Sequence, residues 1–231
     1  MTRRRLGCAR SIVAMLLASA VGSAGAGRAA DLALPERRVF PEGGGGSPST
    51  LERPLAELWP GGRRPGAAAL SIAVHKARRR LDLLVNGRIV KSYIVNLGLA
   101  PEGDKARQGD YRTPEGDLFV CARNARSQFT RFLALAYPSP EHAHRAVSSR
   151  RARPSLERTV REAYRRRDRC PPQGTSLGGA VGIHGSGAWT RGPGGYRLAD
   201  WTWGCIGLRD ADILELFENV RVGTPVRILP D

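Results

Sequence analysis

Long apolar runs are missing from this sequence, and their absence argues against an integral membrane protein. No stretch reaches the roughly 18 apolar residues that a spanning helix needs, once the interrupted N-terminal segment is set aside. Acidic residues are also few: Asp+Glu 21 stand against Lys+Arg 37, and nearly all of the basic excess is arginine. Aromatic residues make up only 6% and show no stacking pattern near the arginines, so we expect no nucleic-acid partner.

The N-terminal segment has the three-part pattern of a secretory signal peptide. A head with four arginines and no acid precedes an apolar stretch at 11–20, and small residues follow up to Ala24-Gly25-Ala26. We therefore predict a signal peptide over residues 1–26 and export to the periplasm or cell envelope. Cleavage after Ala29 fits about as well, and an uncleaved anchor stays open as the alternative.

Residues 27–66 have the composition of a flexible tether. They contain four consecutive glycines, Gly43–Gly46, and further Pro/Gly clusters without sustained periodicity. Order is expected from residue 67, and the 231-residue length leaves room for one domain, 67–231.

The apolar pattern of this domain predicts mostly β structure. Segments with strand character are separated by turn signals, of which Asn86-Gly87 between two β-prone runs is the strongest. The expected strands are 70–74, 81–85, 88–97, 118–121, 132–137, 179–183 and 226–229. Two helices are expected, one over 154–169 and one that Asp210 caps.

Cysteine is scarce as well. Without the signal peptide the chain holds three cysteines, Cys121, Cys170 and Cys205. In an oxidising compartment an odd number leaves one thiol free or paired between chains. A disulfide between Cys121 and Cys170 and a chain with three free thiols both stay open.

Three of the four histidines carry no catalytic signal. His142 and His144 lie in an expected polar loop, without a cysteine or carboxylate cluster at metal-ligand spacing, and His75 follows a strand. We therefore predict neither a metal site nor a cofactor.

His184 and Cys205 differ from these residues because both lie in glycine-rich turns. His184 ends an apolar run and precedes Gly185-Ser186-Gly187, and Cys205 lies between Gly204 and Ile206 just before the helix at Asp210. Cysteine attack needs a thiolate, which a neighbouring imidazole provides by taking the proton. From the residues alone, a structural thiol and a structural histidine remain the alternative.

Several blocks in order then resemble the L,D-transpeptidase catalytic domain. His184 is followed after seventeen residues by Thr202-Trp203-Gly204-Cys205-Ile206, which is similar to the family's His and Ser/Thr-His-Gly-Cys pattern. Upstream, Lys105 and 109–116 resemble the segment GD-x-x-TP-x-G, and 127–138 resembles S-x-F … YP. The resemblance covers residues 69–229 and implies a β-sandwich- or barrel-like catalytic domain with two peripheral helices.

The resemblance also implies roles for single residues. Cys205 would be the nucleophile and His184 the general base, oriented by the Gly185 carbonyl. The N–H groups of Gly204 and Cys205 would form the oxyanion hole. Substrate contacts are expected from Ile183, Thr202, Trp203, Gly207 and Arg209. Trp203 replaces the family's second histidine and Gly207 replaces its frequent arginine, and both changes bear on substrate recognition.

The implied substrate is a peptidoglycan stem tetrapeptide. Cys205 would form a thioester with release of D-Ala, and an amine of another stem or of a wall-anchored protein would resolve it. The chain itself is expected to be a monomer. An L,D-carboxypeptidase or endopeptidase and a non-catalytic peptidoglycan- or polyanion-binding module stay open as alternatives. The ten arginines of 145–169 are either a solvated helix face or a surface attracted to anionic wall polymers.

Overall fold

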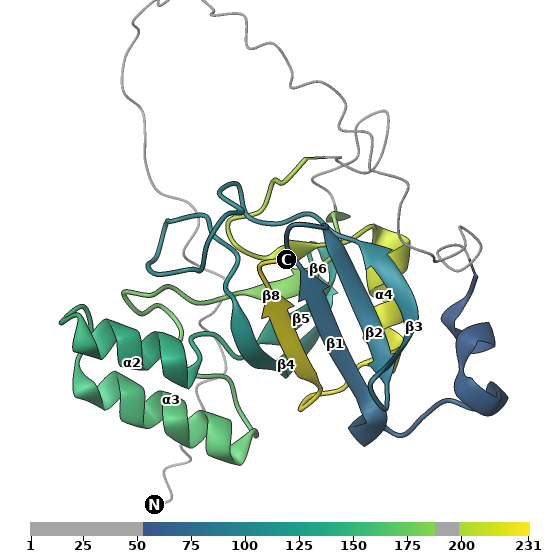
Figure 1. The fold of residues 1–231 in the computed structure, drawn as a ribbon, viewed down its shortest axis with the longest axis horizontal. Coiled ribbons are helices and arrows are strands. Elements are labelled where there is room, and N and C mark those ends of the chain that lie inside the picture. Colours follow the sequence, from purple (N-terminus) through teal and green to yellow (C-terminus); the bar gives the residue numbers. More distant parts are fainter. Residues whose placement is uncertain (1–52, 188–198) are drawn as a thin grey trace, which may run out of the picture. The chain divides into compact units, whose positions relative to one another are not determined.

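The computed structural model describes residues 53–187 and 199–231 (Figure 1). The predicted signal peptide and residues 27–52 of the predicted tether lie outside these ranges. In the part of the chain that is described, no helix is both long enough and apolar enough to cross a membrane.

Among the described residues, eight strands form one curled sheet in the order β3-β2-β1-β8-β4-β5-β6-β7. Neighbouring strands are antiparallel, except that β1–β8 and β6–β7 are parallel pairs. The strands are β1 Leu70–His75, β2 Arg80–Val85, β3 Arg88–Ile94, β4 Gly116–Ser127, β5 Thr130–Leu135, β6 Gly182–His184, β7 Ile206–Gly207 and β8 Pro225–Leu229. The prediction of a mainly β, barrel-like domain is confirmed.

The long strand β4 joins the two halves of the sheet. Its first residues, 116–119, pair with β8, and the rest of the strand pairs with β5. The register shifts between Val120 and Ala122, and such irregularities bend a strand. The sheet therefore curls around a core to which nearly every strand contributes buried aliphatic side chains.

The predicted hairpin is present between β2 and β3. Asn86 and Gly87 have φ values of 48° and 78°, as a two-residue turn of this kind requires. The strands predicted from 70, 81, 88, 118, 132 and 226 all exist, with ends that differ by a few residues. The strand expected over 179–183 is shorter and later, because only Gly182–His184 pair with β5.

The described residues contain three α-helices, where the sequence predicted two. Helices α3 (Pro154–Arg166) and α4 (Asp210–Asn219) were expected, whereas α2 (Pro140–Ser148) occupies the segment predicted as a polar loop. Its start carried a signal, because Ser139 caps it by accepting from the His142 N–H and Pro140 is its first residue. Figure 1 shows α2 and α3 side by side at the edge of the domain.

The end of the predicted tether packs on the domain. Residues Leu55–Leu58 and Pro60–Gly62 form 3-10 turns, and Leu55 and Trp59 are buried in the main core. The Lys91 ammonium donates to the Arg53 carbonyl, which ties this segment to β3. Two apolar side chains within a Pro/Gly-rich sequence are enough to bind it to the sheet. A further 3-10 turn, Ala67–Ala69, leads into β1.

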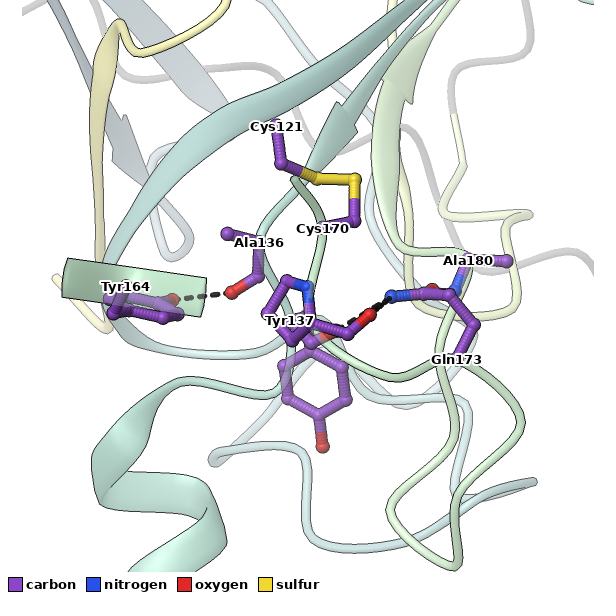
Figure 2. Close-up of a disulfide and its surroundings, with 8 residues drawn as sticks. Cys121, Ala136, Tyr137, Tyr164, Cys170, Gln173 and Ala180 are labelled. Atoms are coloured by element: carbon purple, nitrogen blue, oxygen red, sulfur yellow. Dashed lines mark hydrogen bonds between the residues drawn. A yellow bond between two sulfur atoms is a disulfide. The ribbon is translucent and has the colours of Figure 1, made fainter. Parts of the chain in front are cut away.

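Cys121 and Cys170 form a disulfide, with their Cα atoms 4.9 Å apart (Figure 2). It links β4 to the segment that follows α3, so the pairing that the sequence left open is present. Beyond the disulfide, the Gln173 side chain donates to the Tyr137 carbonyl at 3.2 Å and accepts from the Ala180 N–H. The disulfide and Gln173 thus fix the path of the chain as it approaches β6.

Candidate active site

The sheet edge β6–β7 brings the two predicted catalytic residues into one neighbourhood. These strands are parallel, with Ile183 opposite Ile206 and His184 opposite Gly207. Cys205 therefore immediately precedes the ladder and lies beside Gly182. Two turns that are twenty-one residues apart in the sequence are joined by the hydrogen bonds of one short strand pair.

His184 is oriented by the backbone that follows it. Its Nδ1 lies 2.7 Å from the Gly185 carbonyl oxygen, and because a carbonyl only accepts, Nδ1 carries the proton. Among the described residues Nε2 has no hydrogen-bond partner, so the neutral ring keeps a lone pair on Nε2. This is the tautomer that a general base needs.

Aromatic rings surround the His184 imidazole. Phe132 stacks on it with ring centres 5.7 Å apart, Phe129 lies at 4.5 Å, and Trp201 meets it edge-on at 5.5 Å. The ring is only 3% exposed, and burial lowers the pKa of His184, although the bond to Gly185 acts against that shift. The imidazole is therefore neutral at pH 7.

The turn after His184 depends on a glycine and on Asp210. A Cβ on Gly185 would collide with the Asp210 carboxylate and the Phe129 carbonyl, so only glycine fits. Asp210 Oδ1 accepts the N–H groups of Ser186 and Gly187 at 2.7 and 3.0 Å. Asp210 was predicted to cap α4, but Arg209 is the cap position and Asp210 is the first helical residue.

Cys205 is half-buried and is the free cysteine of the described residues. Its thiol donates to the Ala180 carbonyl at 3.5 Å. Burial raises the pKa of Cys205 to about 11, while a backbone hydrogen bond from Gly182 and the charge of Lys105 act in the opposite direction. The resting pair is thus a neutral thiol and a neutral imidazole, and the thiolate requires proton transfer.

Two buried threonines hold the Cys205 turn. Thr202 Oγ1 donates to the Cys205 carbonyl at 2.7 Å, and Thr113 Oγ1 lies 3.4 Å from the same oxygen. Gly204 has a φ of +122°, and a Cβ there would lie 2.6 Å from the Arg112 carbonyl. The turn is therefore built from glycine and locked from both sides.

The two N–H groups predicted to form the oxyanion hole differ in whether they already have a hydrogen-bond partner. The Gly204 N–H donates to Thr202 Oγ1 at 3.2 Å, so it is already engaged. The Cys205 N–H has no hydrogen-bond partner within residues 53–187 and 199–231. The geometry thus favours the Cys205 amide as the donor for a developing oxyanion.

Of the predicted substrate-binding residues, Trp203 and Arg209 are exposed, and Trp203 is the most exposed. It is 69% exposed and contacts Tyr111 edge-to-face at 6.3 Å. Ile183, Thr202 and Gly207 are buried, and Gly207 packs under the Trp201 ring. The Arg209 guanidinium forms a bidentate pair with Asp212 at 2.6 and 2.9 Å.

Sequence reasoning assigned no role in the site to several residues that build it. Trp201 and Phe132 enclose the imidazole, and Ala180 contacts the thiol. Asp200 holds the chain before Thr202 by pairing with Arg79 at 2.7 Å and accepting the Leu97 N–H. For Asp200 and Trp201 the one signal in the sequence was their position directly before Thr202 and the expected cysteine turn. In the described ranges, no group of three His, Cys, Asp or Glu side chains is placed to hold a metal ion.

A family model for the L,D-transpeptidase catalytic domain, YkuD, matches residues 70–228. The chain belongs to the YkuD family. This match covers the sheet, except the last residue of β8, and the turns at His184 and Cys205 of the YkuD domain described above. None of the curated proteins matches the chain.

Solved structures similar to this YkuD domain include three of distant sequence. The helical cell shape determining protein Pgp2 from Campylobacter jejuni is 21% identical over 71% of this chain and 48% of that chain, with a TM-score of 0.47. An L,D-transpeptidase from Xylanimonas cellulosilytica is 14% identical over 73% and 66%, with a TM-score of 0.41. One from Mycobacterium smegmatis is 15% identical over 70% and 58%, with a TM-score of 0.38. The chain spans about half to two thirds of their lengths.

Proposed function

We propose that this chain is an exported cysteine acyltransferase that acts on peptidoglycan stem peptides. The observation that carries the proposal is the placement of Cys205 beside the β6–β7 ladder that holds His184, within a YkuD domain. A free thiol in a glycine turn and a buried imidazole with an open nitrogen, carried by the two strands of one ladder, support a nucleophile–base pair.

In the first half-reaction, His184 Nε2 takes the thiol proton as Cys205 Sγ attacks the carbonyl that follows the L-centre of the diamino acid. The tetrahedral oxyanion accepts the Cys205 N–H, which has no partner among the described residues. As the C–N bond breaks, the imidazolium returns its proton to the leaving amine. D-Ala departs and a thioester remains on Cys205.

In the second half-reaction, an amine of another stem or of a wall-anchored protein attacks the thioester. His184 takes a proton from that amine and gives it to the departing sulfur, so the resting thiol and imidazole are restored. Water in place of the amine gives a carboxypeptidase outcome by the same steps. The acceptor, not the catalytic pair, separates these outcomes.

The neutral resting pair suits this cycle. A half-buried thiol with a raised pKa is protonated at rest, and a buried imidazole with a lowered pKa is unprotonated and ready to accept. Charge therefore develops only during the attack, where the Cys205 amide and Lys105 oppose the cost of burial.

The test is incubation with purified tetrapeptide muropeptides, followed by mass spectrometry of the products. Cross-linked products or protein adducts are expected for transfer, and trimmed tripeptides for hydrolysis. Cys205→Ala is expected to abolish both while its circular dichroism spectrum stays that of the wild type. Unchanged muropeptides with the folded wild-type protein, across amine acceptors, would support a binding module instead.

A further inference from the structure

Lysine is used in this chain only inside buried ion pairs. The sequence has three lysines, Lys76, Lys91 and Lys105, against an arginine at every other Lys/Arg position. They are 2–5% exposed and their ammonium groups lie 2.6–2.7 Å from the carboxylates of Glu115, Glu215 and Asp110. Burying an ammonium group costs free energy of folding, so we expect each of these lysines to have a structural or functional role.

For two of the lysines, the contacts explain the burial, because each lysine links distant parts of the chain. Lys76 donates to the Gly103 and Thr113 carbonyls as well as to Glu115, and so ties β1 to the loop before β4. Lys91 donates to the Arg53 carbonyl and Glu215, and so ties the N-terminal segment to α4. Both bridge parts of the chain that are distant in sequence.

Lys105 differs because its partners all lie in its own loop. It donates to Asp110 Oδ1 at 2.7 Å and to the Arg107 carbonyl at 3.1 Å, which joins residues no more than five positions apart. A loop of this length does not need a buried ion pair to close, since Asp110 already accepts the N–H groups of Ala106 and Arg107. The reason for a buried cation here must lie in what surrounds it.

Lys105 lies beside the turn that carries Cys205, the proposed nucleophile. Its Nζ lies 3.8 Å from the point where a Cβ on Gly204 would stand, and its Cε lies 3.4 Å from the corresponding point on Gly178. Gly204 directly precedes Cys205, and Gly178 is two residues before Ala180, whose carbonyl accepts the Cys205 thiol. The ammonium therefore lies between the two segments that hold the sulfur.

We propose that Lys105 is a positioning residue whose buried ammonium stabilises the anionic sulfur of Cys205 during attack, with Asp110 moderating its charge. The inference rests on the proposed function only in taking Cys205 as the nucleophile. Lys105 acts through space on the thiolate and does not exchange a proton. The charge of Lys105 lowers the pKa of Cys205, against the larger effect of burial.

Each of the other charged or titratable groups near this turn either is neutral or has a partner of its own. His184 on β6 is neutral, as its lowered pKa requires. The Arg112 guanidinium lies beside Gly103 and the Asp104 carbonyl. Beyond β7, Arg209 pairs with Asp212, and Asp210 accepts the backbone of 186–187. Lys105 is thus the cation whose charge bears on the sulfur.

Asp110 is ionised and sets how much of that charge the sulfur experiences. Burial acts to raise the pKa of Asp110, but the hydrogen bond from Lys105 and those from the backbone N–H groups of Arg107, Ala106 and Arg112 hold it below its usual range. Removing the Asp110 charge should therefore leave a stronger cation beside Cys205. The two partners are expected to change thiol reactivity in opposite directions.

The experiment measures alkylation of Cys205 in the full chain by iodoacetamide between pH 6 and 9, with the Cys205 peptide followed by mass spectrometry. Lys105→Met is expected to slow alkylation at pH 7 about tenfold, because one unit of thiol pKa changes the thiolate fraction tenfold. Asp110→Asn is expected to speed it about threefold or more. Lys91→Met is the matched control, since it removes an equally buried ion pair whose partners, Arg53 and Glu215, lie outside the Cys205 turn, and its rate should stay within about twofold of wild type.

Unfolding is separated from charge by recording circular dichroism and thermal denaturation for each variant. If Lys105→Met and Asp110→Asn shift the rate in the same direction, or if Lys91→Met shifts it as much as Lys105→Met, the role of Lys105 is structural and the proposal falls. An unchanged rate in folded Lys105→Met also overturns it. Because alkylation needs no substrate, these outcomes are independent of whether muropeptides are processed.

Discussion

Two histidines in this domain are equally buried and yet lie in opposite surroundings. His142 and His184 are each 3% exposed. His142 has both nitrogens engaged, with Nε2 2.9 Å from Asp104 Oδ1 and Nδ1 2.7 Å from Ser139 Oγ. His184 has one nitrogen on the neutral Gly185 carbonyl, and its ring contacts are aromatic.

The difference bears on the role proposed for His184. The Asp104 carboxylate occupies the nitrogen that would take a proton, so His142 holds α2 against the loop at Asp104. An aromatic enclosure with one neutral acceptor disfavours the imidazolium and leaves Nε2 open. Burial is common to both residues, and the partners decide the role.

The largest expected effect is the difference in activity between His184→Ala and His142→Ala. His184→Ala should lower kcat/KM on muropeptides by about 10²–10⁴-fold with the fold retained, as loss of a general base does. His142→Ala should lower it less than tenfold, but should reduce the free energy of unfolding by about 1–3 kcal/mol because Ser139 and Asp104 lose their partner. Turnover assays and urea denaturation of both variants check this, and equal losses of activity would break the comparison.

The next effect is on the pH profile. Burial lowers the pKa of His184 below its usual 6.5, so the neutral base persists as pH falls and the acid limb of kcat/KM should lie below pH 6.5. Trp201→Ala should admit water to the ring and move that limb upward toward 6.5. Trp201→Phe keeps a ring and removes only a buried Nε1 that has no partner among the described residues, so its limb should stay in place. A limb above pH 6.5 in the wild type would contradict the aromatic enclosure as its cause.

The smallest expected effect is on how much of the free energy of unfolding is lost at acid pH when His142 is replaced. Burial acts to raise the pKa of Asp104, but the hydrogen bond and charge of His142, with the Glu115 N–H and Arg145, hold it below its usual 3.8. A lowered carboxyl pKa stabilises the fold above pH 3.8, and that contribution is lost as pH falls through the folded value. His142→Ala should therefore show less loss of stability between pH 5 and 3 than wild type, by about 1 kcal/mol or less because Asp104 is partly exposed. Urea midpoints at several pH values check this.

Sequence reasoning could reach features that local patterns encode. His184 and Cys205 lie in glycine turns that precede and follow apolar strands, and local patterns of that kind survive in the sequence. Asn86-Gly87 predicted its hairpin for the same reason, because a two-residue turn has strict φ requirements.

Sequence reasoning failed where the deciding contacts are distant in the chain. His142 was placed in a loop because α2 is short and its buried face includes a histidine, whose partner Asp104 is thirty-eight residues away. Leu55 and Trp59 were assigned to a tether because their Pro/Gly-rich surroundings hide two core side chains.

Trapping the acyl-enzyme tests directly whether Cys205 and His184 act as a nucleophile–base pair. The full chain is mixed with a tetrapeptide muropeptide, quenched in acid, and examined by intact mass and peptide mapping. We expect an adduct equal to the substrate minus D-Ala on Cys205, released by hydroxylamine, absent in Cys205→Ala and formed at least about 10²-fold more slowly in His184→Ala. Turnover with an adduct on another residue, or with an equal rate of adduct formation in His184→Ala, would contradict this expectation.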